Sequence, residues 1–125
     1  MFNNFLKIDN ELLIVKGFIN NMSEYMKAST IVISKPGGVT TTEVAELRKP
    51  LILMMPIPGV EDYNMKFFLN NQMCLKATNV SDLVVQSKKL LASKTLQDAI
   101  IKNQEENIKT YSAKALVEFV LNQKK

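Results

Sequence analysis

The sequence contains no histidine and a single cysteine. Without histidine, the chain by itself forms no histidine metal site, no Ser-His-Asp triad and no Cys-His pair. Cys74 lies in an apolar stretch and excludes an internal disulfide, which fits a reducing cytoplasm. No apolar run approaches the ~20 residues of a membrane span, and polar residues interrupt the first apolar stretch where a signal peptide would lie. We therefore expect a cytoplasmic chain whose membrane contact is at most peripheral.

The composition is that of an ordinary globular core. Hydrophobic residues make up 46% of the 125 residues and charged residues 22%, so the chain is one domain or a piece of one. The net charge of +4 suits a partner that carries phosphates or an anionic membrane surface, and it selects neither. A solvated surface with a lysine-rich tail explains the same charge. We expect no nucleic-acid partner.

Short apolar runs alternate with helical patterns along the chain. The predicted strands span residues 12–18, 30–34, 51–55 and 73–77. The predicted helices follow Asn21 and span residues 39–48 and 62–72, and a helical pattern continues over residues 80–122. Strands that read as uninterrupted apolar runs between helices are typical of a parallel sheet. The prediction is an α/β fold with a Rossmann-like parallel sheet and helices on both faces.

The unusual residues of the sequence gather in three loops. In an open parallel α/β sheet, ligands bind beyond the carboxyl ends of the strands. The loops predicted at that edge span residues 18–22, 34–43 and 56–64. We therefore expect the binding site to be built from these loops.

The second loop has the chemistry of a diphosphate site. Gly37 and Gly38 permit positive φ angles and close backbone approach, and they lead directly into a helix whose first N–H groups attract an anion. Lys35 and the hydroxyls of residues 40–42 lie at the same helix start. The pattern is neither a P-loop nor G-x-G-x-x-G, so on its own it is a weak signal.

Glu43 has two interpretations. Thr40-x-x-Glu43 matches a capping box, in which the carboxylate bonds to the start of its own helix. Alternatively, Glu43 accepts hydrogen bonds from the ribose hydroxyls of a nucleotide, as an acid near a nucleotide-binding helix often does.

The third loop presents Glu61, Asp62 and Asn64 after the turn at Pro58-Gly59. These side chains can bond to the hydroxyls of a sugar, or the two acids can simply favour the start of the next helix through its dipole. Two adjacent acids with no further ligand are weak evidence for a metal site or an acid/base pair, and we expect no metal.

Together these loops resemble the C-terminal domain of diacylglycerol glycosyltransferases. That family includes bacterial diacylglycerol glucosyltransferase and plant monogalactosyldiacylglycerol synthase, and it is distantly similar to the N-acetylglucosaminyltransferase of peptidoglycan lipid synthesis. The resemblance covers residues 12–78, in order, whereas the C-terminal helices match only in type. The segments that carry it are Gly17-Phe18-Ile19-Asn20-Asn21-Met22, Ile33-Ser34-Lys35-Pro36-Gly37-Gly38-Val39-Thr40-Thr41-Thr42-Glu43, Lys49-Pro50 and Pro56-Ile57-Pro58-Gly59-Val60-Glu61-Asp62-Tyr63-Asn64.

The resemblance implies a GT-B architecture, in which the second of two Rossmann-like domains binds a UDP-sugar donor. Residues 1–125 would form part of that domain. Catalysis would be a metal-independent, cofactor-independent transfer of a hexose to a lipid such as diacylglycerol. By analogy, the donor contacts would be Phe18, Ile19 and Met22 at the uracil, Gly37, Gly38 and Thr40 at the diphosphate, Glu43 at the ribose, and Glu61 and Asn64 at the hexose.

The chain departs from the family in two respects. Val60 stands where relatives usually carry glutamine, so one sugar contact is lost. From the resemblance we expect the N-terminal domain with the acceptor site and catalytic base, and also the first two strands of the donor domain, to lie outside these 125 residues. We therefore expect no catalytic residue here and no activity of the chain alone. Sheet edges left exposed by the missing strands would favour a homodimer or strand exchange.

Two other functions remain open. The chain could be a non-catalytic nucleotide-binding or assembly subunit of a split glycosyltransferase. It could also be an unrelated α/β regulatory domain whose glycine loop merely caps a helix, in which case it would not respond to UDP.

Overall fold

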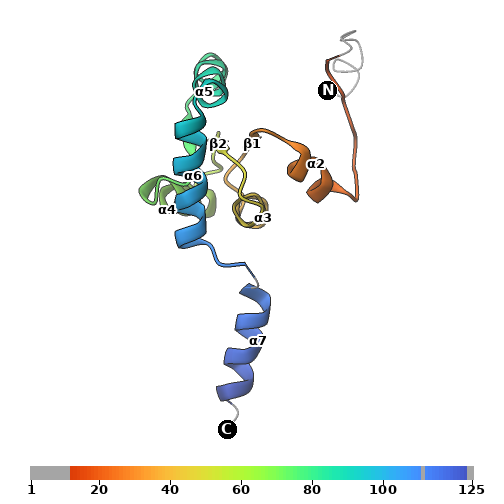
Figure 1. Ribbon diagram of the computed structural model, residues 1–125, viewed down its shortest axis with the longest axis vertical. Coiled ribbons are helices and arrows are strands. Elements are labelled where there is room, and N and C mark those ends of the chain that lie inside the picture. Colours follow the sequence, from red (N-terminus) through yellow and green to blue (C-terminus); the bar gives the residue numbers. More distant parts are fainter. Residues whose placement is uncertain (1–11, 111, 124–125) are drawn as a thin grey trace.

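The computed structural model describes residues 12–110 and 112–123. This described part contains three strands and six helices, which alternate along the first half of the chain (Figure 1). In chain order the elements are α2 (Met22–Ala28), β1 (Val32–Ser34), α3 (Gly38–Glu46), β2 (Leu51–Met54), α4 (Val60–Asn70), β3 (Leu75–Ala77), α5 (Val80–Ala92), α6 (Lys94–Asn107) and α7 (Ser112–Gln123).

The strands form one parallel sheet in the order β1-β2-β3. Val32 pairs with Leu51 at one end of β1, and Ile52 pairs with Leu75 of β3. The central strand β2 is apolar throughout and its first three residues are buried, because it has a neighbour on each side and helices on each face. The predicted α/β fold with a parallel sheet is confirmed.

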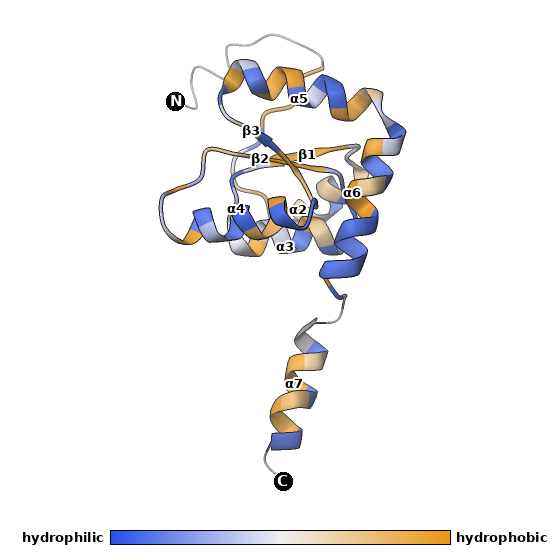
Figure 2. Ribbon diagram, turned by 90° about the vertical axis from the view of Figure 1, so that its left-hand side faces the viewer, coloured by the Kyte–Doolittle hydropathy of each residue, from blue (hydrophilic) through white to orange (hydrophobic). Residues whose placement is uncertain are grey.

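Helices cover both faces of the sheet. Figure 2 shows α5 on one face, and α3 and α4 on the other. Successive side chains of a strand point to opposite faces, so Leu51 and Leu53 enter one core cluster while Ile52 enters the other. The first cluster also contains Val44 of α3 and Phe68 of α4. The second is completed by Ala77, Leu90 and Ile100.

The predicted strand at residues 12–18 is wrong. Residues 12–18 carry no strand, and the side chains of Leu12, Ile14 and Phe18 are 94%, 72% and 99% exposed. A strand must pair its backbone groups with a neighbour, and no further strand lies beside β1 within residues 12–110. An apolar run alone therefore does not form a strand here.

The last helix, α7, extends away from the body (Figures 1 and 2). Its large apolar residues stay exposed. They are Leu116, Val117, Phe119, Val120 and Leu121. Within the described part of the chain, no helix combines the length and apolar character needed to cross a membrane.

Candidate functional site

The loop after β1 turns sharply into α3. The Gly37 N–H donates to the Lys35 carbonyl at 2.9 Å, and the first bond of the helix runs from the Thr41 N–H to the Gly37 carbonyl at 3.0 Å. Gly37 has a φ of −70°, so the turn does not use the positive φ that glycine permits. What the two glycines contribute here is therefore the absence of a side chain, and not an unusual backbone conformation.

Glu43 does not form the predicted capping box. The helix begins at Gly38, so Thr40 lies within its first turn and does not cap it. The Gly37 N-cap provides no side-chain hydrogen bond, which leaves the N–H groups of Gly38, Val39 and Thr40 without an acceptor in the described residues. A helix start of this kind has a positive potential and free donors for an anion.

Open space lies beside this helix start. A Cβ atom added to Gly37 or to Gly38 would meet no other atom within 4 Å. Thr40 is half-buried, and Lys35 on the preceding turn is exposed. The backbone at both glycines therefore faces open space.

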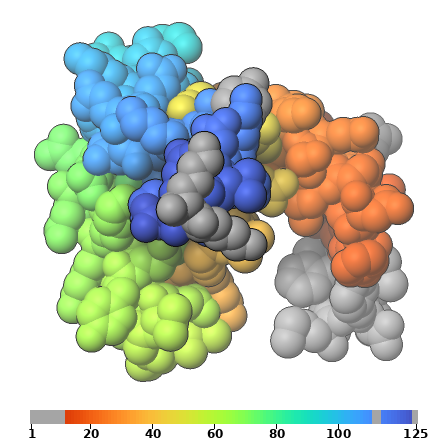
Figure 3. Space-filling model, turned by 90° about the horizontal axis from the view of Figure 1, so that it is seen from below, coloured from red at the N-terminus to blue at the C-terminus, as the bar shows by residue number. Residues whose placement is uncertain are grey.

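A cleft of ≈ 390 Å³ lies between α2, β1 and α3. It contains three of the predicted donor residues, Met22, Thr40 and Glu43. Seen from below, α2 (orange) lies to one side of the other elements and α7 (dark blue) points toward the viewer (Figure 3). The remaining lining residues are Tyr25, Met26, Ser29, Ile31, Val32, Ile33 and Ser34.

Glu43 lies at the boundary between two hollows. It lines the cleft beside α2 and also an open hollow of ≈ 560 Å³ on the outer side of α3 with Gly38 and Thr42. Its side chain is half-buried, and in the described part of the chain no hydrogen bond or ion pair of its carboxylate is found. The carboxylate is thus available to a ligand in either hollow.

The residues before α2 lie outside this cleft. Phe18 is 99% exposed and Ile19 is half-buried. The predicted helix after Asn21 is confirmed, but the Asn21 side chain does not cap it by accepting an N–H; instead its Nδ2 donates to Glu24 Oε2 at 3.2 Å. The structure therefore brings Met22, and neither Phe18 nor Ile19, to the walls of the cleft.

The two acids of the third loop accept hydrogen bonds from backbone N–H groups of the same loop. Glu61 Oε1 accepts a hydrogen bond from the Ile57 N–H at 3.3 Å, and Asp62 Oδ2 accepts one from the Gly59 N–H at 3.0 Å. Gly59 has a φ of 106°, so this turn does require glycine. Both acids lie in the first turn of α4, where the helix dipole favours negative charge. Val60 is 84% exposed beside them.

Asn64 joins the second and third loops. Its Nδ2 donates to the Pro36 carbonyl and to Thr41 Oγ1, both at 2.8 Å. An amide nitrogen carries two hydrogens, so both are used within the chain and Oδ1 is the atom left to accept from a ligand. Asn64 is half-buried on α4.

Two residues near the site were missed by the sequence argument. Tyr25 lies one helical turn after Met22, on the same face of α2, and this spacing was the available signal. Thr41 was treated as one of three equivalent hydroxyls, but it alone of the three is fully buried. Both its burial and its bond to Asn64 depend on contacts distant in sequence, so the local pattern does not reveal them.

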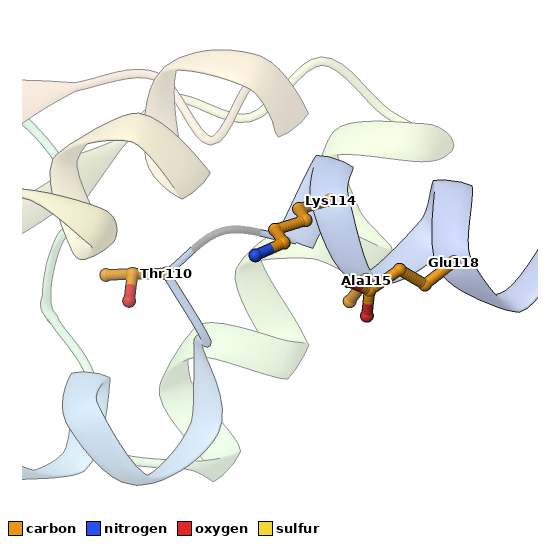
Figure 4. A pocket seen from close by; sticks show the side chains of 4 residues that line it. All are labelled: Thr110, Lys114, Ala115 and Glu118. Atoms are coloured by element: carbon orange, nitrogen blue, oxygen red, sulfur yellow. The ribbon is translucent and has the colours of Figure 1, made fainter.

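A further hollow of ≈ 420 Å³ lies where α6 is joined to α7. Figure 4 shows its lining, which is formed by Thr110 of the connection and by Lys114, Ala115 and Glu118 of α7. It contains none of the predicted site residues. Cys74 lies in the first core cluster, where burial raises the pKa of its thiol to about 12 and keeps the thiol protonated.

Comparison with known proteins identifies the family to which the chain is related. The family model described as "Glycosyltransferase family 28 C-terminal domain" matches residues 2–124. A processive diacylglycerol beta-glucosyltransferase of Bacillus cytotoxicus is 34% identical over 83 residues, which cover 66% of this chain and 21% of the relative. One from Bacillus cereus strain B4264 is 32% identical over 85 residues, or 68% of this chain and 22% of the relative. The matched region is thus about a fifth of the length of these curated relatives. No solved structure matches the chain with significance.

Proposed function

This chain belongs to the family of glycosyltransferase family 28 C-terminal domains, and on that premise we propose that it binds the UDP-hexose donor of an enzyme that transfers the hexose to a lipid such as diacylglycerol. The names of its relatives support the lipid acceptor and the hexose. Because the matched region is only about a fifth of those relatives, we propose that the acceptor site and the catalytic base lie outside it, and that the chain alone does not catalyse transfer.

The start of α3 is the observation that carries the donor proposal. The N–H groups of Gly38, Val39 and Thr40 lack an acceptor in the described part of the chain, and they lie beside the open space over the two glycines. The diphosphate of UDP binds there, with the Thr40 hydroxyl as an additional donor. The same helix end stabilises the negative charge of UDP as it leaves the hexose.

The cleft between α2, β1 and α3 takes the uridine. Glu43 is one helical turn from the diphosphate donors, and its carboxylate accepts hydrogen bonds from the two ribose hydroxyls. Met22 and Tyr25, which are 49% and 42% exposed, provide an apolar wall for the uracil ring. Phe18 and Ile19 precede α2 and reach the uracil only if this segment moves toward the cleft.

The third loop holds the hexose. Glu61 and Asn64 are the proposed contacts, with Asn64 acting through Oδ1 because both of its N–H groups are already bonded. Val60 provides an apolar side chain where relatives usually carry an amide. The donor sugar is therefore held by fewer hydrogen bonds on this side.

The exposed edge of the sheet favours a second function, that of a non-catalytic subunit in a split glycosyltransferase. In the described part of the chain β1 pairs with β2 alone, and Ile33 at the centre of β1 is 42% exposed. An edge of this kind accepts a strand from another chain, either a complementary subunit or a second copy of this one.

Nucleotide titration of the 125-residue chain tests the donor proposal. We expect UDP and UDP-glucose to shift amide resonances of α3 and to bind more tightly than ADP. Glu43→Ala should weaken UDP binding by roughly 10-fold, because a hydrogen bond to a charged group contributes about 1.5–3 kcal/mol. Glu106→Ala on α6 removes the same charge at an exposed residue that does not line the cleft, and it should not change UDP binding. Equal indifference to UDP, UDP-glucose and ADP would overturn the proposal.

A further inference from the structure

Thr41 is a fully buried polar residue at the start of α3, with 0% exposure. Its Oγ1 donates to the Gly37 carbonyl at 2.8 Å and lies 3.3 Å from the Gly38 carbonyl. The same oxygen accepts the hydrogen bond from Asn64 Nδ2 at 2.8 Å. A threonine within a helix often bonds to the preceding turn, but one that also accepts a bond from another helix does more than satisfy its own hydroxyl.

These bonds occupy the carbonyls of the glycine turn. The Pro36 carbonyl accepts from Asn64, and the Gly37 carbonyl accepts from both the N–H and the hydroxyl of Thr41. Carbonyl oxygens repel a phosphate, whereas N–H groups attract it. When the turn's carbonyls are bonded inside the protein, the polar groups that it offers to a ligand are the N–H groups of the helix start.

The same bonds connect two loops that are distant in sequence. Asn64 is on α4, which follows β2, and its partners Pro36 and Thr41 follow β1. Asn64 is 28 residues from Pro36 and 23 from Thr41. The position of the glycine turn is thereby fixed relative to α4, and groups held in place before binding lose less freedom when the ligand arrives.

We propose that Thr41 and Asn64 are positioning residues that hold the Pro36-Gly37-Gly38 turn in the geometry that receives the donor's diphosphate. This inference rests on the proposed function, because it assumes that the diphosphate binds at α3. It assigns to Thr41 a role that acts through the backbone, without contact between its side chain and the nucleotide.

A comparison of UDP with uridine isolates this role. Only UDP carries the diphosphate, so loss of the hydroxyl in Thr41→Val should weaken UDP binding by roughly 10-fold and leave uridine binding within about 2-fold. Thr41→Ser keeps the hydroxyl and should bind UDP within about 2-fold of the unchanged chain. Thr95→Val, at an exposed threonine of α6, is the matched control. Dissociation constants from NMR titration and a melting curve of each variant give the readouts.

The possible outcomes of this experiment separate the positioning role of Thr41 from the donor site itself. Suppose that the unchanged chain binds UDP. If Thr41→Val then binds UDP equally well, or if its affinities for uridine and UDP fall by the same factor, the positioning role is wrong while the donor site stands. If the unchanged chain binds neither ligand, the proposed function falls and the positioning role falls with it. If Thr41→Val does not fold, Asn64→Ala at the half-buried partner decides by the same UDP-to-uridine ratio.

Discussion

Gln104 Nε2 on α6 donates a hydrogen bond of 2.8 Å to the backbone carbonyl of Lys49, 55 residues earlier in the chain. The same nitrogen lies 3.3 Å from the Met73 carbonyl, which precedes β3. Gln104 is fully buried, and its amide forms a polar contact between α6 and the residues that precede β2 and β3. Its Oε1 is buried with no partner among the described residues.

Gln104→Leu tests how much this contact stabilises the sheet. The substitution leaves the carbonyls of Lys49 and Met73 without their donor, which should cost about 1–3 kcal/mol in the free energy of unfolding. Loss of the unsatisfied Oε1 offsets part of that cost. Urea denaturation gives the measurement, and Gln123→Leu at an exposed position of α7 is the control. A Gln104→Leu chain as stable as the original would show that the amide contributes nothing net.

Two helices end on residues that strain the backbone. Arg48 after α3 and Gln72 after α4 have φ angles of 56° and 54°, a region that favours glycine. Gln72 is exposed, so Gln72→Gly should raise the free energy of unfolding by about 1 kcal/mol. Arg48→Gly relieves the same strain but removes the hydrogen bonds from the guanidinium to the carbonyls of Ala45 and Ile108. We expect denaturation curves to show a gain for Gln72→Gly and none for Arg48→Gly.

The start of α5 should make stability depend on acid pH. Asp82 accepts hydrogen bonds from the N–H of Thr78 at 2.9 Å and from Gln86 Nε2 at 3.1 Å. The Thr78 backbone bond, followed by the Gln86 bond, lowers the pKa of this carboxyl below its usual 3.8. The folded state is therefore stabilised at pH values above the unfolded pKa, and this contribution disappears as the pH falls through the lower folded pKa.

Asp82→Asn removes the titrating group from α5. Its melting temperature should fall less than that of the unchanged chain when the pH is lowered from about 5 to about 3. The effect is small, because Asp82 is only half-buried and water screens its charge. Glu106→Gln, at an exposed acid of α6, should follow the unchanged chain. Identical pH profiles for Asp82→Asn and the unchanged chain would contradict the prediction that the lowered pKa of Asp82 contributes to stability.

The sheet was predictable because its signals are local. Apolar runs with β-branched and aliphatic residues predicted β1, β2 and β3 within two residues at each end, and the turns between them predicted α3 and α4. The absence of a strand at residues 12–18 was not predictable in this way, since a strand depends on a neighbour and the apolar run itself carries no information about one.

The site was predictable only in part, for a similar reason. The glycine turn and Glu43 follow from local chemistry, and the structure brings Met22, Thr40 and Glu43 to one cleft. The capping box failed because the N-cap is Gly37, three residues before Thr40, and the Thr-x-x-Glu pattern alone does not fix where the helix starts. The contact between Thr41 and Asn64 spans 23 residues, so no local spacing reveals it.

Gly38→Ala separates the fold from the proposed ligand. Gly38 is the first residue of α3. Its φ is not positive, and an added Cβ would lie in open space. Alanine should therefore stabilise the folded chain by up to about 1 kcal/mol, since it favours a helix more than glycine does. The same methyl group would occupy the space through which the diphosphate approaches the backbone, so UDP affinity should fall by roughly 10-fold or more. Gly59→Ala is the opposite control: its φ of 106° makes alanine destabilising even though the space around it is also open. A Gly38→Ala chain that melts higher and binds UDP as before would place the diphosphate away from α3.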